Sequence, residues 1–144
     1  MKNIRHHFIA VLLLLTAFGS QAQAQGSKVA MILSTDNPQV AGMALHMAWG
    51  MKRMSGANVT VVLGAGSVKF ALKKGDSPMF SPKKKNLRAL IQDVLDQGAK
   101  VYVCGLCAYA QKVGQDDLVK GVSIQSGDVI MPLLADPGVK VISF

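Results

Sequence analysis

Glutamate is absent from this sequence of 144 residues, so all eight acidic side chains are aspartates. A mechanism that needs a glutamate as general acid or base is therefore excluded. Histidine is nearly as scarce, because His6 and His7 fall in the first seven residues and only His46 lies further along. One histidine cannot build a multi-histidine metal site within one chain. We therefore expect no bound metal and no cofactor, and covalent chemistry would have to use sulfur.

The sequence also lacks an apolar run long enough to cross a membrane. Its longest such run covers residues 8–18, eleven positions, whereas a helix needs roughly 20 residues to span the ~30 Å core of a bilayer. Lys2 and Arg5 precede the run, and the small-x-small pattern Ala22-Gln23-Ala24 follows it. This order is typical of a secretory signal peptide. We predict that residues 1–24 are a signal peptide, that cleavage after Ala24 removes the apolar segment, and that the mature protein is periplasmic or secreted.

The remaining residues 25–144 have a length that suits one domain. Without Lys2 and Arg5, 14 of the 16 basic residues remain against 8 acidic ones, a net charge of +6. Seven of the basic residues fall within twenty positions: Lys69, Lys73, Lys74, Lys83, Lys84, Lys85 and Arg88. Such a stretch is either a solvated loop or an attraction for an acidic partner, an anionic substrate or a membrane surface. Nucleic acid is not an expected partner, because an exported protein rarely meets it and few aromatic residues interleave the charges.

Apolar strand-like segments alternate with helical ones along the domain. Strands are predicted at residues 28–34, 58–63, 100–104, 121–124 and 139–144, and helices at residues 39–54, 64–74, 82–97, 105–113 and 128–135, with a loop at residues 75–82. This alternation favours an α/β fold with a parallel sheet and helices on its faces. In such sheets the reactive groups gather where the strands end.

Two cysteines, Cys104 and Cys107, lie at one of these strand ends in the segment Val103-Cys104-Gly105-Leu106-Cys107. Unpaired amides at a helix start favour the thiolate, which is the reactive form of cysteine. The spacing places Cys107 one turn from Cys104, close enough to attack a disulfide or persulfide formed there. We therefore predict Cys104 and Cys107 as the catalytic residues.

An inert disulfide is the structural alternative for these cysteines in an exported protein. A ring of four residues would contribute only about 2 kcal/mol, however, compared with roughly 4.7 kcal/mol for a ring of a hundred residues. A thioredoxin-like site is disfavoured because no tryptophan stands directly before the motif and Gly-Leu occupies its centre. Half of a four-ligand zinc site is the remaining alternative.

Several segments resemble the DsrE/DsrF-like family, in order and over nearly the whole mature chain. They are residues 28–34, the alanine-rich first helix, residues 56–63, the stretch GAKVYVCGLC within residues 97–107, and residues 139–144. The cysteine stretch is the most specific of them. The resemblance implies a flavodoxin-like three-layer sandwich with a mostly parallel five-stranded sheet, often assembled as a trimer or hexamer. It also implies sulfur handling as a cysteine persulfide, with Cys104 at the family's position and a protein as sulfur donor or acceptor.

Two further features have functional and structural interpretations. Met43, Met47, Met51 and Met54 recur at helical spacing, which favours core packing or a subunit interface over a copper site. The loop Gly64-Ala65-Gly66 is a tight turn or an anion cradle, and with Lys69 it is a candidate for the mouth of the thiol site.

Two hypotheses follow from the sequence. In the first, the protein carries or transfers sulfane sulfur on the C-x-x-C motif. In the second, it is a non-catalytic oligomeric binding module in which Cys104 and Cys107 form a structural or redox disulfide and the basic loop makes the contacts.

Overall fold

The computed structural model describes residues 26–144. The predicted signal peptide at residues 1–24 and its cleavage site lie outside the described residues. Residues 26–144 form the α/β domain that the sequence predicts.

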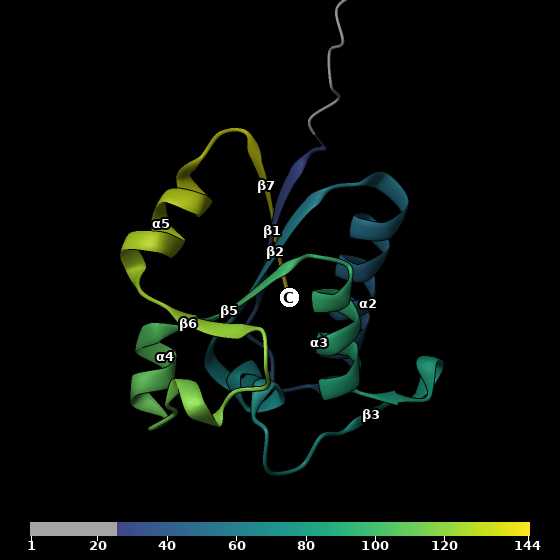
Figure 1. Cartoon of the computed structure of the whole chain (residues 1–144), viewed down its shortest axis with the longest axis vertical. Coiled ribbons are helices and arrows are strands. Elements are labelled where there is room, and N and C mark those ends of the chain that lie inside the picture. Colours follow the sequence, from purple (N-terminus) through teal and green to yellow (C-terminus); the bar gives the residue numbers. More distant parts are fainter. Residues whose placement is uncertain (1–25) are drawn as a thin grey trace, which may run out of the picture.

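Five strands make one parallel sheet (Figure 1). In chain order they are β1 (Lys28–Leu33), β2 (Asn58–Leu63), β5 (Lys100–Cys104), β6 (Val122–Gln125) and β7 (Val139–Ser143). In space they are ordered β6-β5-β2-β1-β7, and every neighbouring pair is parallel. The predicted five-stranded sheet is confirmed, and each strand lies within a residue or two of its expected position.

One face of the sheet packs against helices α2 (Pro38–Ser55) and α3 (Leu87–Asp96) (Figure 1). The Asn37 side chain accepts hydrogen bonds from the first amides of α2, and Gly56 ends that helix at a φ of 64°. The buried face of α2 consists of small residues and Leu45, which lets the helix approach the sheet closely. Alternate side chains of β1, β2 and β5 complete this core.

The other face of the sheet carries a single helix, α5 (Gly127–Ala135). The chain advances from β1 to β2, β5 and β6 in one direction and then returns across the sheet to β7. Because parallel crossovers are right-handed, this reversal moves α5 to the opposite face from α2 and α3. The result is the expected three-layer flavodoxin-like sandwich.

The same reversal creates a crevice between β5 and β6. The connection leaving β5 enters α4 (Gly105–Ala110), whose Ala108 packs into the core shared with α2 and α3. The connection leaving the neighbouring strand β6 enters α5 on the opposite face. Where adjacent strands send their chains to opposite faces, a crevice opens at their carboxyl ends. Cys104 is the last residue of β5 and therefore lies at this crevice.

The segment before α3 differs from the sequence prediction. The predicted helix at residues 82–97 begins only at Leu87, because a small hairpin of β3 (Met79–Phe80) and β4 (Lys85–Asn86) precedes it, enclosing the 3₁₀ turn η2 (Ser81–Lys83). Lys84 adopts a φ of 51°, which a helix does not tolerate, and Asn86 caps the true helix start by accepting from Ala89 N–H. Phe80 holds the hairpin in place, since its buried ring packs directly over Gly42 of α2.

Two other predicted helices are shorter or tighter than expected. Helix α4, which contains Cys107, ends at Ala110 rather than at the predicted residue 113. Lys112 then adopts a φ of 55°. The segment predicted as a helix at residues 64–74 forms the 3₁₀ helix η1 (Ala65–Ala71). A further single 3₁₀ turn, η3 (Gln115–Asp117), leads into β6.

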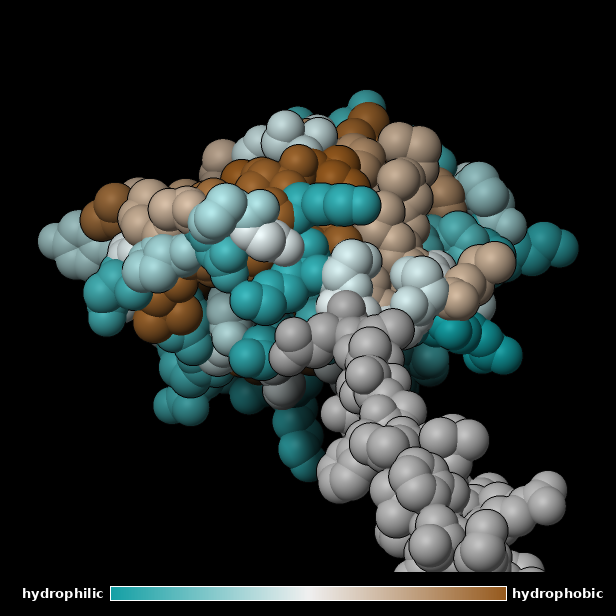
Figure 2. Space-filling view, turned by 90° about the horizontal axis from the view of Figure 1, so that it is seen from above, coloured by the Kyte–Doolittle hydropathy of each residue, from teal (hydrophilic) through white to brown (hydrophobic). Residues whose placement is uncertain are grey.

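Hydrophobic side chains also lie on the surface. From above, they gather along one side of the molecule, while hydrophilic residues cover most of the rest (Figure 2). The large exposed hydrophobic residues are Met43, Met47, Met54, Met79, Leu106, Tyr109, Val129, Met131 and Val141. Three of the four methionines of α2 are thus on the surface, so the core-packing interpretation holds for Met51 alone. Across residues 26–144, no helix has the length and apolar character that a membrane crossing requires.

Candidate functional site: a thiol pair at the end of β5

Cys104 and Cys107 lie together at the carboxyl end of strand β5, as the sequence predicts. Cys104 ends β5, Cys107 is in the first turn of α4, and both are partly exposed free thiols. Gly105 between them approaches the main chain at the end of β6, where an added Cβ would lie 3.0 Å from the carbonyl oxygen of Gln125. Glycine at this position lets α4 start against the neighbouring strand.

The pKa values of the two thiols are shifted in opposite directions. Burial alone would raise the pKa of Cys104, but the Cys107 thiol and the amides of Cys107 and Leu106 face its sulfur, and together they lower that pKa below its ordinary value. The Cys104 side chain does not, however, make a helix-cap hydrogen bond with these amides. Burial raises the pKa of Cys107; the Ala65 amide opposes this only in part, and the neighbouring Cys104 raises that pKa further. Cys104 is thus the more acidic thiol of the pair and Cys107 the less acidic one.

The loop after β2 holds the second thiol. Ala65 N–H donates to Cys107 Sγ at 3.3 Å, and the Gln111 side chain donates to the Ala65 carbonyl at 2.8 Å. Ala65 adopts a φ of 45°, an uncommon conformation for a residue with a side chain, and this turns its amide toward the sulfur. Gly64 and Ala65 of the predicted loop thus lie close to the thiols, whereas Gly66 packs against Asp36.

Lys69 was predicted to accompany this loop, but its ammonium group lies 5.3 Å from the ring of Phe70 instead. It does not line the crevice beside Cys104. The sequence did not single out Gln111, although its place four residues after Cys107, one turn along a helix, was a signal that it shares a face with that thiol.

A pocket of about 220 Å³ opens beside Cys104 at the crevice. Its walls come from the ends of β1, β2, β5 and β6, from the start of α4 and from α5. The contribution of α5 was not predicted, because periodicity does not tell on which face of the sheet a helix packs. Among residues 26–144, no group of three or more His, Cys, Asp or Glu side chains is placed to hold a metal ion.

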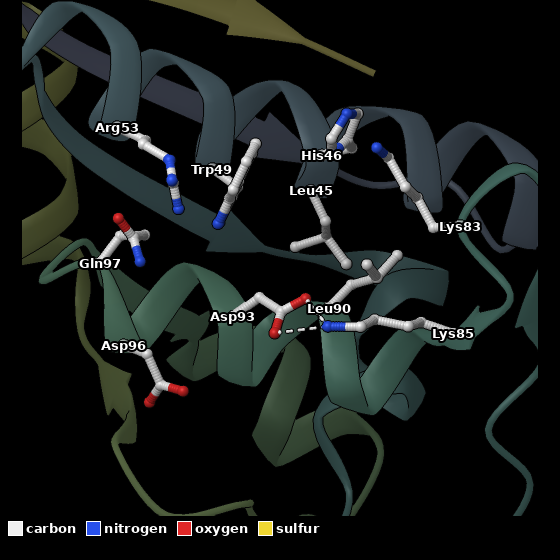
Figure 3. Close-up of a pocket in the computed structure, with 10 residues that line it drawn as sticks. All are labelled: Leu45, His46, Trp49, Arg53, Lys83, Lys85, Leu90, Asp93, Asp96 and Gln97. Carbon is white, nitrogen blue, oxygen red and sulfur yellow. Dashed lines mark hydrogen bonds and ion pairs between the residues drawn. The ribbon is translucent and has the colours of Figure 1, made fainter.

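A second depression, about 350 Å³, lies between α2 and α3 and is lined by side chains of both signs (Figure 3). His46 and Trp49 stack with ring centroids 5.4 Å apart, and Arg53 lies over the Trp49 ring at 5.2 Å. Lys85 pairs with Asp93 at 2.8 Å across the floor. Burial, followed by the charge of Lys83, lowers the pKa of His46, so Arg53 and Lys83 are the positive charges left to meet a ligand.

The predicted basic stretch is not one uniform patch. Lys73 Nζ donates to the Asp116 carbonyl, and Arg88 Nε donates to the Leu72 carbonyl at 2.7 Å. These side chains brace the loop between η1 and α3, and Lys85 is paired within the second depression. Three of the seven basic residues of the stretch, Lys73, Lys85 and Arg88, therefore make contacts within the protein.

Comparison with known proteins agrees with this fold. The profile of the DsrE/DsrF-like family matches residues 9–144. An uncharacterised protein of Methanopyrus kandleri is 34% identical over 55 residues, which is 38% of this chain and 43% of that protein. The matched segment thus spans less than half of that relative's length.

Three of the solved structures that share this fold come from different organisms. The YchN protein of E. coli superposes with a TM-score of 0.66 at 18% identity, covering 82% of this chain and 99% of that one. A conserved protein of unknown function from Bacteroides thetaiotaomicron gives 0.62 at 20% identity, covering 86% and 100%. A protein of unknown function from Methanobacterium thermoautotrophicum gives 0.62 at 18% identity, covering 81% and 98%.

Proposed function

This chain belongs to the DsrE/DsrF-like family, and from that membership together with the geometry of its thiols we propose that it carries sulfane sulfur as a persulfide on Cys104. The observation that supports the proposal is the asymmetric thiol pair at the crevice. Cys104, with its lowered pKa, borders the pocket, while Cys107, with its raised pKa, stands beside it. A lowered pKa favours the attacking thiolate at Cys104, and a raised pKa at Cys107 disfavours early attack on a persulfide formed there.

Loading requires no reagent beyond the donor. The Cys104 thiolate attacks the outer sulfur of a donor persulfide R–S–SH, the donor S–S bond breaks, and R–S⁻ leaves with the electron pair. The product is Cys104–S–SH. An acceptor thiolate can then take the outer sulfur by the same reaction, which restores the Cys104 thiolate.

Cys107 provides a second outcome for the loaded protein. Its thiolate can attack Cys104 Sγ, forming the Cys104–Cys107 disulfide and releasing HS⁻. The disulfide then needs a dithiol reductant to return both thiols, a reaction that consumes one reductant molecule per cycle. The raised pKa of Cys107 disfavours this route at neutral pH and so prolongs the life of the persulfide.

Mass spectrometry of the reduced protein after exposure to inorganic polysulfide tests the proposal. We expect a gain of one sulfur atom, located on Cys104, in the wild type and in Cys107→Ser, and no gain in Cys104→Ser. Absence of the gain from the wild type, or its location on Cys107, would exclude the proposed role of Cys104.

The location of this chemistry is also a proposal. We infer that residues 1–24 direct export and that the mature protein is periplasmic or secreted. The N-terminal sequence of the protein purified from its own host tests this, with a start near Gln25 expected and an intact Met1 contradicting it.

A binding module remains the second candidate, and the groove between α2 and α3 favours it. Arg53 over the Trp49 ring and Lys83 in the same depression suit an acidic segment that carries an aromatic or apolar side chain. In that case Arg53→Ala would weaken capture of the partner, whereas replacing both cysteines by serine would leave capture and phenotype unchanged. The opposite pattern supports the sulfur carrier.

A further inference from the structure

The pocket beside Cys104 is almost entirely apolar. The apolar side chains that line it are Ile32, Val62, Leu106, Ile130, Met131 and Leu134. Apart from Cys104 itself, none of the lining residues can ionise. Gln125 is the one polar side chain among them, and its amide donates to Ser123 Oγ at 3.2 Å. A charged group placed in this pocket would therefore lose its hydration without gaining a partner.

Two glycines of the lining keep the pocket open without being required by the backbone. Gly64 is extended, with φ −131° and ψ 171°, and an added Cβ would meet only Cys107 Sγ, at the ordinary distance of 3.7 Å. At Gly127 an added Cβ would meet nothing within 4 Å. Neither position needs glycine for conformation or for packing, so a side chain can be added to the lining at either position without strain.

The pocket volume limits what can occupy this space. About 220 Å³ corresponds to roughly seven water-sized groups and lies below the ~300–1,000 Å³ of pockets that enclose drug-sized ligands. A folded partner cannot enter the pocket, and the tripeptide glutathione carries three charged groups for which the lining offers no charged partner.

We propose that the sulfur donor of Cys104 is a small organic persulfide, R–S–SH, whose substituent R is uncharged and apolar and binds in this pocket. The inference rests on the proposed carrier function and adds the class of donor. The apolar walls hold R, and the outer sulfur faces Cys104 at the pocket wall. The Cys104 thiolate forms a bond to that outer sulfur, the donor S–S bond breaks, and R–S⁻ leaves with the electron pair and takes a proton from water.

The test compares two donors with the same reacting group on the full mature chain, reduced beforehand. Benzyl hydropersulfide is apolar and glutathione hydropersulfide is charged. The rate of persulfide formation on Cys104 is followed by mass spectrometry, and each rate is divided by the rate of the same donor with free cysteine. We expect the normalised rate to be at least about tenfold higher with the benzyl donor, the scale that apolar pocket contacts provide.

Filling the pocket should remove this preference. Gly127→Leu places a side chain in the open space, and we expect it to reduce the benzyl rate about tenfold while leaving the glutathione rate unchanged. Val129→Leu is the matched control, because Val129 lies on the same helix and does not line the pocket. Met131→Gln, which makes the wall polar, provides a second variant should Gly127→Leu fail to fold.

The outcomes separate this inference from the function on which it rests. If neither donor modifies Cys104, both are overturned. If both donors react at equal normalised rates, or if the pocket variants keep the preference, the carrier function stands and the apolar donor is overturned. If Gly127→Leu changes the sedimentation of the protein rather than the donor preference, a second copy of the chain covers the pocket, and the inference fails.

Discussion

Cys104 and Cys107 have the same side chain but different surroundings. Amides and a neighbouring thiol face the sulfur of Cys104, whereas Cys107 packs against the core and accepts one hydrogen bond, from Ala65. Stabilisation of a thiolate by donors can outweigh the effect of partial burial, and this happens for Cys104 alone. The surroundings of the two residues therefore make Cys104 the more acidic thiol of the pair.

Replacing Cys107 should change the titration of Cys104. Cys107→Ala removes the thiol that faces the Cys104 sulfur, so the pKa of Cys104 rises and its alkylation at neutral pH slows. The measurement is the rate of iodoacetamide labelling of Cys104 as a function of pH, read by mass spectrometry.

Cys107→Ser is the control for that experiment, because its hydroxyl can still donate to Cys104. Its midpoint should lie nearer to that of the wild type than the midpoint of Cys107→Ala does. An unchanged midpoint in Cys107→Ala would mean that the amides alone set the pKa of Cys104.

Asp136 shows the same principle at a surface site with a structural role. A hydrogen bond from Lys28 at 3.0 Å, and then one from Gly138 N–H, lower the pKa of Asp136 and connect the start of β1 to the turn before β7. The stabilisation is complete above the unfolded pKa of about 3.9 and is lost as pH falls through the lower folded value.

Asp136→Asn should therefore lower the Tm at pH 7, and the difference from the wild type should disappear at pH values below the folded pKa. Thermal melts at several pH values check this. A Tm difference that persists unchanged in acid would show that the introduced amide side chain disturbs the turn for another reason.

At the scale of elements, the thiol site depends on how closely two loops approach each other. The start of η1 packs so tightly against the loop after β1 that a Cβ on Gly66 would lie 2.7 Å from the Cβ of Asp36. This packing presents the Ala65 amide to Cys107. Gly66 therefore supports the thiol site without contacting either sulfur, because it allows the close packing that positions Ala65.

Gly66→Ala should destabilise the protein by about 1–3 kcal/mol, because the loop must move to admit the methyl group. It should also raise the pKa of Cys107 further, as the Ala65 amide turns away. Urea unfolding and the pH dependence of Cys107 labelling measure the two effects.

Gly50→Ala is the matched control for Gly66→Ala. Gly50 lies within α2 with nothing within 4 Å of an added Cβ, so the same substitution should stabilise by about 0.5–1 kcal/mol through helix propensity. Equal effects of the two substitutions would contradict the steric argument.

At the scale of the whole molecule, the exposed hydrophobic residues indicate assembly. Tyr109 on α4 and Met54 on α2 are each 85% exposed, and Met43 and Met47 on the same helix α2 are also exposed. Clustered exposed apolar side chains usually mark an interface, and the edge strand β7 adds the half-exposed Val141. We expect a homo-oligomer, a trimer or a hexamer, in solution.

Sedimentation velocity over a range of concentrations tests the expected assembly. We predict a species larger than the monomer and a Tm that increases with protein concentration, because association stabilises the folded chain by mass action. A monomer with a concentration-independent Tm would leave the exposed residues without an oligomeric explanation.

The sequence alone determined the strands, the helix α2 and the position of the thiols. Runs of buried Val, Leu and Ile end at turn-forming residues, Asn37 and Gly56 carry their capping chemistry locally, and Cys104 follows directly from the end of a predicted strand. The DsrE/DsrF-like resemblance rested on the same local segments. These features depend on neighbours within a few positions, so a linear pattern is enough to reveal them.

Only the tertiary structure decided what surrounds the thiols. The hairpin before α3 forms because Phe80 finds a buried site over Gly42, nearly forty positions away. The pocket exists because the chain reverses across the sheet after β6 and brings α5 to the face beside Cys104. The Ala65 amide reaches Cys107 across 42 positions of sequence. Such contacts depend on the packing of the whole chain, and the spacing of residues along it carries no record of them.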